Sequence, residues 1–319
     1  MSDNVADLRN FVEDINKLKQ EIAKTIVGQT DVVNDLLIAI FSKGHALLVG
    51  VPGLAKTLLV STIAKSLGLT FSRIQFTPDL MPSDITGAEI LDKNREFKLV
   101  KGPIFSNIIL ADEINRTPPK TQSALLEAMQ EKSVTISTLT YKLDEPFFVL
   151  ATQNPIEQEG TYPLPEAQLD RFMFNINLDY PSFTEEVDII KRTTTNIEPE
   201  TNIILSKEEI LKYQNLVRII PVPDNVYNYA VKLVARTRPN SAEAPEIVKK
   251  YLSWGAGPRA SQYLILGAKC NAAINGKPSP DYEDVNAVAK PILRHRLVKN
   301  YVAEAEGITH DNIVEQIME

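Results

Sequence analysis

Glycine, lysine and threonine stand at the spacing of a phosphate-binding loop near the start of the chain. The segment Gly50-Val51-Pro52-Gly53-Leu54-Ala55-Lys56-Thr57 follows four apolar residues, and a run of helical periodicity begins at Leu58. This order predicts a buried strand, a tight turn and a helix. The backbone N–H groups of such a turn point at a phosphate, at the positive end of the helix dipole. We expect Lys56 to reach the β- and γ-phosphates and the Thr57 hydroxyl to hold Mg²⁺.

One position departs from the usual G-x-x-x-x-G-K-S/T pattern, because Ala55 stands where the last glycine is expected. Alanine adopts right-handed helical angles without strain, whereas a positive φ is costly for a residue with a Cβ. The sequence therefore predicts that the loop tolerates Ala55 only if this residue is already helix-like. A match with alanine allowed arises by chance in roughly a few per cent of chains this long. Other residues must decide whether the loop is functional.

Two acidic residues and one amide follow later strands. Asp112 and Glu113 come directly after the apolar segment 106–111, and Asn154 ends the apolar strand pattern that begins at residue 147. The carboxyl ends of parallel strands form the ligand-binding edge of open α/β sheets. Asp112 is expected to hold Mg²⁺ through its water shell, and Glu113 to polarise the attacking water. Asn154 is expected to orient that water or bind the γ-phosphate. The alternatives are an exposed acidic pair that caps a helix and an Asn-Pro turn.

Phosphoryl transfer also gains from an arginine, worth roughly 10³ to 10⁵ in rate. Arg171 lies at the end of a short predicted helix before a strand, and Arg259 lies in the first turn of a helix after Pro258. A cation at a helix N-terminus opposes the dipole, so Arg259 predicts an anionic partner, and a phosphate is one. The alternative for both arginines is a surface ion pair.

The elements that must position these residues alternate between strand and helix in the first 180 residues. Strands are predicted at 46–49, 70–76, 106–111, 147–152 and 172–178, helices at 11–23, 31–41, 58–67, 120–130 and 166–170, and hairpins at 88–100 and 134–143. Such alternation predicts a largely parallel sheet covered by helices on both faces. Later patterns are helical, at 185–194, 207–218, 224–237, 258–274 and 281–297. We predict an α/β nucleotide-binding core (1–180), linker helices (181–222) and a smaller all-helical lid domain (223–319).

Composition excludes several function classes. The 319 residues suffice for about two domains, and 44% hydrophobic with 24% charged residues is ordinary for a soluble globular protein. The net charge of −7 argues mildly against a dedicated nucleic-acid surface. Cys270 is the only cysteine, so no internal disulfide can form, and we expect a packed, unreactive thiol. Three scattered histidines predict no zinc site. A polar N-terminus and short apolar runs predict a cytoplasmic protein without a signal peptide or membrane span.

Four motifs together resemble one known family. The phosphate loop, the segments Leu110–Arg116 and Ala151–Pro155, and the run Leu164–Phe172 are all similar to the MoxR family of AAA+ ATPases. The similarity covers most of the chain, from about residue 26 to its end, and alanine at the position of Ala55 is itself typical of this family. The resemblance implies a P-loop AAA+ core with a helical lid, and ATP and Mg²⁺ as ligands.

The resemblance also implies a role for each site residue. Lys56 and Thr57 correspond to Walker A, Asp112 and Glu113 to Walker B, Asn154 to sensor 1, Arg171 to the arginine finger, and Arg259 to sensor 2. The segment Ile26–Gln29 resembles the one that packs on adenine. The residues expected to bind ATP are Val27, Gly28, Gly50, Val51, Pro52, Gly53, Leu54, Ala55, Lys56, Thr57 and Leu58.

Partners are implied by the family alone. In this group the finger acts on the nucleotide of a neighbouring subunit, which implies a homo-oligomeric ring, usually a hexamer. The expected partner is a von Willebrand factor A-type protein, and the expected function is that of a chaperone in metal insertion or complex maturation. Two alternatives stay open: a scaffold that binds ATP to assemble but barely hydrolyses it, and a DNA-remodelling motor. The second draws on a basic cluster at the first hairpin: Lys93, Arg95, Lys98 and Lys101.

Overall fold

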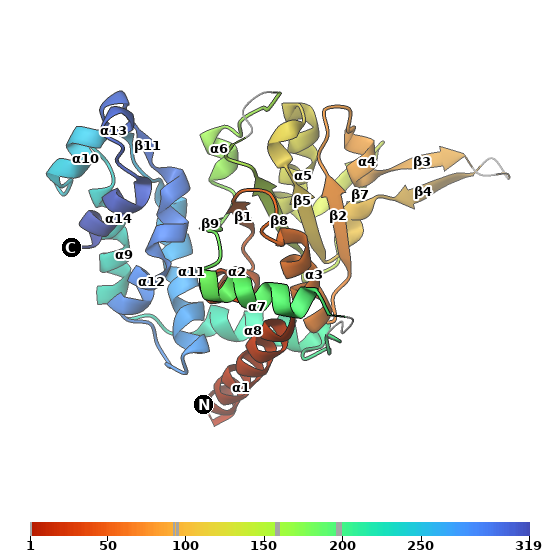
Figure 1. The fold of residues 1–319 in the computed structure, drawn as a ribbon, viewed down its shortest axis with the longest axis horizontal. Helices are drawn as coiled ribbons and strands as arrows, with labels where there is room; N and C mark the ends of the chain where they lie inside the picture. The colour runs from red at the N-terminus through yellow and green to blue at the C-terminus, as the bar shows by residue number, and fades with distance from the viewer. Residues whose placement is uncertain (1, 92, 94–95, 157–159, 196–199) are drawn as a thin grey trace.

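The computed structural model describes residues 2–91, 93, 96–156, 160–195 and 200–319 (Figure 1). Its centre is a five-stranded sheet with the order β2-β5-β8-β1-β9. All four strand pairings are parallel. The strands are β1 (Ala46–Val49), β2 (Phe71–Gln75), β5 (Ile108–Asp112), β8 (Phe148–Gln153) and β9 (Phe174–Asn177). The predicted parallel α/β core is confirmed, and every predicted strand is present within a few residues of its expected bounds.

Helices cover both faces of this sheet because successive side chains on each strand point to opposite faces. One face packs on α1 (Ser2–Thr25), α2 (Thr30–Phe41) and α3 (Lys56–Ser66). The opposite face packs on α4 (Pro82–Thr86) and α5 (Pro119–Glu131). On β1, Leu48 belongs to the first apolar cluster and its neighbour Leu47 to the second. Both leucines are fully buried.

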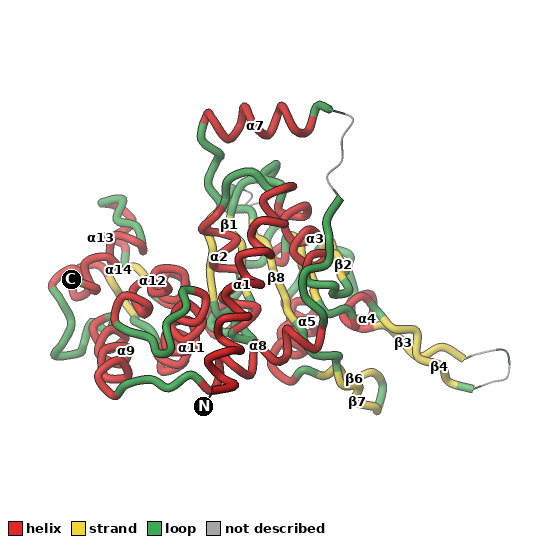
Figure 2. The backbone as a smooth tube through the Cα atoms, turned by 90° about the horizontal axis from the view of Figure 1, so that it is seen from below, coloured by secondary structure: helices red, strands yellow, loops and turns green. Residues whose placement is uncertain are grey.

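Two antiparallel hairpins leave this body. The first joins β3 (Gly87–Leu91) to β4 (Phe97–Lys101), and the second joins β6 (Ser133–Ile136) to β7 (Leu139–Lys142). The first hairpin projects away from the rest of the molecule in both views (Figures 1 and 2). Its predicted turn, 92–95, lies outside the described residues except for Lys93. Phe97, 75% exposed, and Leu91, 57% exposed, face each other across the two strands.

The C-terminal part is helical with one exception. Its helices are α9 (Asp224–Arg236), α10 (Glu246–Tyr251), α11 (Pro258–Ile274), α12 (Tyr282–Leu293), α13 (Tyr301–Ala305) and α14 (His310–Met318). A short strand, β10 (Leu252–Trp254), pairs antiparallel with β11 (Val298–Lys299). The expected helix 281–297 therefore ends at residue 293, and the expected wholly helical lid contains a two-stranded ribbon.

Contacts to the core explain why α12 ends early. The chain turns through a 3₁₀ helix, Arg294–Arg296, and both arginines reach the edge strand β9 or the loop before it. Arg294 Nη1 donates to the carbonyl of Asn175 at 2.9 Å, and Arg296 Nη2 donates to the carbonyl of Phe172 at 2.7 Å. Arg296 also pairs with Asp170, with Nε 2.8 Å from Oδ1. These charge-assisted contacts need a local geometry that a continued α-helix would not supply.

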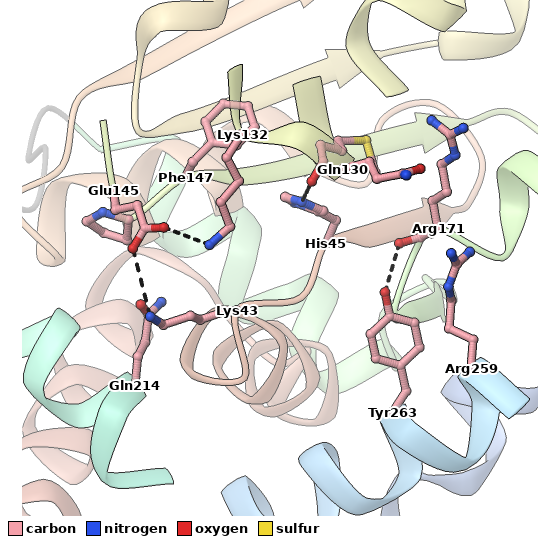
Figure 3. Close-up of a pocket in the computed structure, with 12 residues that line it drawn as sticks. Lys43, His45, Gln130, Lys132, Glu145, Phe147, Arg171, Gln214, Arg259 and Tyr263 are labelled. Atoms are coloured by element: carbon pink, nitrogen blue, oxygen red, sulfur yellow. Dashed lines mark hydrogen bonds and ion pairs between the residues drawn. The ribbon is translucent and has the colours of Figure 1, made fainter. Parts of the chain in front are cut away.

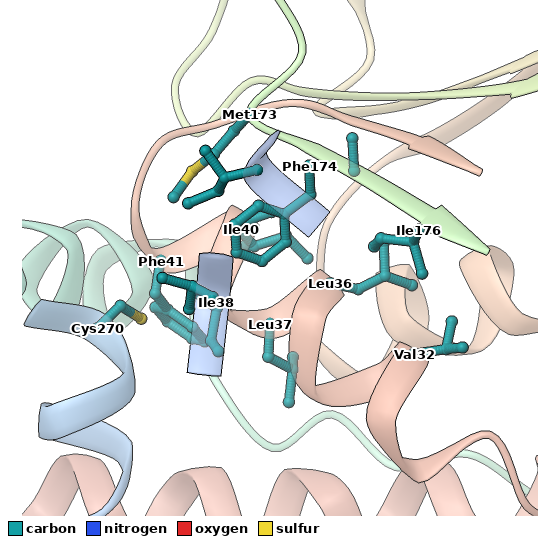
Figure 4. Packing of buried hydrophobic residues seen from close by; sticks show 14 of the residues in the cluster. Val32, Leu36, Leu37, Ile38, Ile40, Phe41, Met173, Phe174, Ile176 and Cys270 are labelled. Carbon is teal, nitrogen blue, oxygen red and sulfur yellow. The ribbon is translucent and has the colours of Figure 1, made fainter. Parts of the chain in front are cut away.

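Two further helices, α7 and α8, lie between the core and the lid in the sequence. α8 (Lys207–Ile219) packs on the core, where Tyr213 contacts the rings of Phe11 and Phe41. Near Phe41, the thiol of Cys270 on α11 is packed among apolar side chains (Figure 4). Burial raises the pKa of the Cys270 thiol to about 12, and the predicted packing of this thiol is confirmed.

α7 (Phe183–Thr193), by contrast, stands away from the body in Figure 2 and contains no buried residue. Arg192 Nη1 at its far end donates to the carbonyl of Ala23 at 3.0 Å. Within the described part of the chain, no helix combines the length and apolar character needed to span a bilayer.

Candidate nucleotide site

The phosphate loop joins β1 to α3 at the carboxyl edge of the sheet. Gly53 has φ of 89°, and the ammonium of Lys56 donates a hydrogen bond to the carbonyl of Gly50 across the turn. Burial lowers the pKa of Lys56, while Asp112 and Glu113 act in the opposite direction. Lys56 therefore lies within electrostatic reach of both carboxylates.

Ala55 does not have the expected helix-like angles. It immediately precedes α3 with φ of 53° and ψ of 28°, which is the left-handed region. The prediction that the loop tolerates alanine only with right-handed angles is therefore wrong. The residues after Ala55 must begin α3, and the residues before it form the turn that leads back over the helix. This reversal imposes a positive φ on whichever residue occupies position 55. A left-handed conformation costs an L-residue roughly 1–2 kcal/mol, and the loop retains that strain.

The two acidic residues are held by a residue that sequence reasoning missed. The hydroxyl of Thr152, on β8, donates to Asp112 Oδ1 at 2.6 Å and accepts from the backbone N–H of Glu113 at 2.9 Å. Thr152 is 1% exposed. The pairing of Ala111 with Ala151 in the β5–β8 ladder places Thr152 beside Asp112. A hydroxyl at the end of a strand that neighbours Asp112 was the available signal.

Residues of β2 also contact the carboxylates. Arg73 Nε and Nη2 donate to Asp112 Oδ2 at 3.0 and 2.7 Å. Gln75 Nε2 donates to Glu113 Oε2 at 3.0 Å, and Arg116 Nη1 lies 3.0 Å from the same oxygen. Neither Arg73 nor Gln75 was expected at the site, because β2 is an edge strand whose pattern carried no motif. Arg116, to which the motifs assign no role, also contacts Glu113, the residue expected to be catalytic.

The segment expected to pack on adenine lies beside the loop. Gly28 has φ of 67°, and a Cβ built on it would lie 2.3 Å from Glu185 Oε1 on α7. The next residue, Gln29, has φ of 54° and donates from Nε2 to the carbonyl of Leu54 at 3.4 Å. Val27 and Gly28 are thus tied to the phosphate loop on one side and approached by α7 on the other.

Asn154 lies at the same edge, with 8% of its surface exposed. Its Oδ1 accepts from the backbone N–H of Ile156 at 3.2 Å, which is the local Asn-Pro turn named as its alternative. That contact leaves the amide nitrogen of Asn154 as the group for a phosphate or a water. The position fits the sensor role, and the role itself stays a prediction.

Arg171 and Arg259 lie together at the opposite end of the sheet. Both line one pocket with His45 and Phe147, residues that directly precede β1 and β8 (Figure 3). β1 has four residues, so about 13 Å of strand separates this end from the phosphate loop. The structure therefore does not bring the two arginines to the loop of their own chain.

Each arginine already has a protein partner. Arg171 Nη1 donates to the carbonyl of Leu126 at 2.7 Å. Arg259 Nη1 pairs with Asp170 Oδ2 at 2.9 Å. The anionic partner of Arg259 in this structure is thus the carboxylate of Asp170. This is the surface ion pair that was named as the alternative to a phosphate. The pair is partly exposed, so Arg259 can exchange this partner for another anion.

The loop and the carboxylates fit Mg²⁺ and a nucleotide. The first N–H groups of α3 have no acceptor within the helix, and Lys56 and Thr57 supply two of them. A Cβ on Gly53 would meet no atom within 4 Å, so the loop has open space beside it. Mg²⁺ prefers oxygen ligands shared with phosphates and waters, and the Thr57 hydroxyl and Asp112 provide two. No group of three or more His, Cys, Asp or Glu residues forms a complete metal site among the described residues.

Fold and site together define the class: a P-loop nucleotide-binding domain of the AAA type with a lid. The family model for "ATPase family associated with various cellular activities (AAA)" matches residues 45–174, and the AAA lid domain model matches residues 244–317. The exact division into 1–180, 181–222 and 223–319 stays a prediction.

Comparison with known proteins narrows the class. The chain is 46% identical to Chaperone MoxR1 of Mycobacterium tuberculosis over 94% of this chain and 79% of that protein. It is 29% identical to Protein MoxR of Methylorubrum extorquens, covering 90% and 88% of the two chains. A crystal structure from Cytophaga hutchinsonii has a TM-score of 0.92 at 47% identity, covering 98% of this chain and 96% of that one. The chain belongs to the MoxR family of AAA+ ATPases, as its motifs predicted.

The strain at Ala55 gives the first prediction. Ala55→Gly should raise the free energy of unfolding of the core by about 0.5–1 kcal/mol, because the gain at positive φ exceeds the entropy that glycine adds to the unfolded chain. Ala287→Gly is the matched control, since Ala287 is exposed in the right-handed interior of α12. That control should lose about 1 kcal/mol. Urea unfolding of the two variants should therefore give shifts of opposite sign, and destabilisation by both would contradict the strain.

Thr152 gives the second prediction. Thr152→Val keeps the shape but leaves the N–H of Glu113 without its acceptor, at a cost of about 1–3 kcal/mol in unfolding free energy. It should also lower ATP turnover by at least tenfold, because Asp112 and Glu113 lose the group that aligns them. Thr152→Ser keeps the hydroxyl and should stay within about threefold of the unmodified rate. Equal turnover by the valine and serine variants would exclude an aligning role for the hydroxyl.

Proposed function

We propose that the chain binds and hydrolyses ATP at the carboxyl edge of its sheet. The observation that carries this proposal is the pair Asp112–Glu113, fixed by the Thr152 hydroxyl beside the ammonium of Lys56. The family to which the chain belongs supports the same activity in general terms. The ATP-binding residues are those named from the sequence, from Val27 and Gly28 to the loop between Gly50 and Leu58.

Each side chain then has one task. Lys56 and the N–H groups at the start of α3 bind the β- and γ-phosphates, and Thr57 and Asp112 hold Mg²⁺ with its waters. Bound Mg²⁺ supplies charge neutralisation on the phosphate oxygens. Glu113 accepts a proton from the attacking water, and Asn154 orients that water through its amide nitrogen.

The positive charge that stabilises the transition state comes from a second copy of the chain. Arg171 and Arg259 lie a full strand length from the loop of their own chain, which supports action on the nucleotide of a neighbour. This geometry favours a head-to-tail assembly, which closes into a ring when the rotation permits. We propose a hexamer, in which Arg171 is the finger and Arg259 acts as sensor 2 in trans.

The cycle of this ring would remodel a protein partner. The chain is similar to a protein named a chaperone, and the projecting β3–β4 hairpin exposes apolar side chains suited to a polypeptide. We propose a von Willebrand factor A-type partner in the cytoplasm, and metal insertion or complex maturation as the outcome. The exposed large apolar residues in the described strands of the hairpin are Ile90, Leu91, Phe97 and Val100.

Two other functions remain distinguishable by experiment. A scaffold that binds ATP without turnover would release no phosphate, whereas the proposed ATPase releases it steadily. A DNA motor would show DNA-stimulated hydrolysis with a steep salt dependence. Lys93, Lys98 and Lys101 lie in or beside the hairpin strands, and Arg95 lies outside the described residues. The acidic net charge of −7 disfavours this second function.

Removal of the catalytic carboxylate gives the third prediction. Glu113→Gln should lower ATP hydrolysis by at least 10²-fold and leave ATP affinity within about threefold, because the amide cannot accept the proton of water. Phosphate release and equilibrium binding measure the two effects. The same variant with ATP should retain a client or partner in a pull-down. Unchanged steady-state hydrolysis would show that Glu113 is not the base.

A mixing experiment gives the fourth prediction and tests action in trans. Arg171→Ala should abolish hydrolysis and leave ATP binding largely intact, and Glu113→Gln alone should also be inactive. Mixed rings should regain part of the activity, because an Arg171→Ala subunit still has Glu113 and receives an intact finger from a Glu113→Gln neighbour. No recovery in rings that demonstrably exchange subunits would argue that Arg171 acts within its own chain.

A further inference from the structure

Both carboxylates expected at the reaction centre are engaged from the edge strand β2. Asp112 Oδ2 accepts two hydrogen bonds from Arg73, and Asp112 Oδ1 accepts one from Thr152. Glu113 Oε2 accepts from Gln75. The function proposed above uses neither Arg73 nor Gln75.

The contacts form one continuous chain across the site. Arg73 Nη2, which donates to Asp112, also lies 2.6 Å from Gln75 Oε1 and donates to it. Gln75 Nε2 then donates to Glu113 at 3.0 Å. Arg73 and Gln75 can meet because alternate residues of a strand project on the same face. The Mg²⁺ carboxylate and the catalytic carboxylate are thereby linked through two side chains of β2.

The positive charge of Arg73 lies on the carboxylate that is expected to hold Mg²⁺, so the guanidinium and the metal ion would compete for Asp112. The side chain of Asp112 is 15% exposed and that of Arg73 is 46% exposed. Arg73 therefore has a path to solvent, whereas Asp112 is fixed between Thr152 and the sheet. A guanidinium with two N–H groups on one carboxylate oxygen uses the lone pairs through which that oxygen would bind a metal ion or its waters.

We infer that Arg73 is a stand-in cation, which neutralises and orients Asp112 in the nucleotide-free subunit and must leave when Mg²⁺ arrives. Arg73 thus acts through Asp112 as a positioning residue and touches no substrate. This inference rests on the proposed ATP function and adds how that site changes between its empty and loaded states.

Two other readings of the same contacts make different predictions. If Arg73 is a surface ion pair without consequence, its removal changes nothing, since exposed pairs contribute little. If Arg73 instead turns to contact a phosphate, its removal weakens nucleotide binding whether Mg²⁺ is present or not. A stand-in cation alone predicts that removal eases Mg²⁺ entry.

Equilibrium binding of a fluorescent, non-hydrolysable ATP analogue as a function of free Mg²⁺ tests this inference without any turnover. In Arg73→Gln the half-saturating Mg²⁺ concentration should fall about fivefold, at the upper end for a partly exposed ion pair. Affinity for the analogue in EDTA should stay within about twofold. Arg73→Lys keeps the positive charge but loses the two N–H groups directed at one oxygen. Its half-saturating Mg²⁺ concentration should lie between those of Arg73→Gln and the unmodified protein.

Lys212→Gln is the matched control, because Lys212 of α8 forms a partly exposed ion pair with Asp7 of α1 and makes no contact with Asp112 or Glu113 among those described above. It should behave like the unmodified protein. An unchanged half-saturating Mg²⁺ concentration in both Arg73 variants would overturn the inference, and so would a loss of EDTA affinity. If the unmodified protein bound the analogue at no Mg²⁺ concentration, the proposed ATP function itself would fail. Circular dichroism confirms folding, and Arg73→Lys keeps the test decisive if Arg73→Gln does not fold.

Discussion

The hydroxyl of Thr152 is the contact on which the candidate reaction centre depends. It satisfies the backbone N–H of Glu113 and one oxygen of Asp112 at once, and it is itself buried. A buried hydroxyl with one donor and one acceptor bond has little freedom to rotate. Because Thr152 belongs to the central strand β8, its hydroxyl ties Asp112 and Glu113 to the rigid sheet and not to a mobile loop.

Three of the six described non-glycine residues with positive φ lie around the same centre; the other three, Lys43, Lys132 and Ser137, lie elsewhere. Gln29, Ala55 and Glu113 all have positive φ without being glycine, and each stands where the chain leaves one element and must approach another. Gln29 ends the segment expected to pack on adenine, Ala55 precedes α3, and Glu113 follows β5. Residues in such conformations persist only where the surroundings hold them. At these three positions the surrounding structure therefore holds a backbone geometry that relaxed turns would not supply.

The sequence predicted the parts of the site that obey local rules. The loop, the strand ends at Asp112 and Asn154, and the parallel sheet follow from periodicity and from the placement of glycine and acidic residues. Arg73, Gln75 and Thr152 could not be found that way, because their roles arise from register between strands that are distant in the chain. The left-handed angles of Ala55 and the early end of α12 were missed for a related reason: tertiary contacts overrode the local preference.

The placement of the arginines has a consequence for how hydrolysis is controlled. Asp170 pairs with both Arg259 of α11 and Arg296 of the lid, so the charge of one core carboxylate ties two lid cations to the end of the sheet that bears Arg171. Arg296 is nearly buried and fixes the lid, whereas Arg259 is partly exposed and can move. In the assembly proposed above, a phosphate of a neighbouring subunit would compete with Asp170 for Arg259 alone, because Arg296 is nearly buried. The lid would then stay attached through Arg296 while Arg259 changes partner, so that assembly would govern the charge available for catalysis.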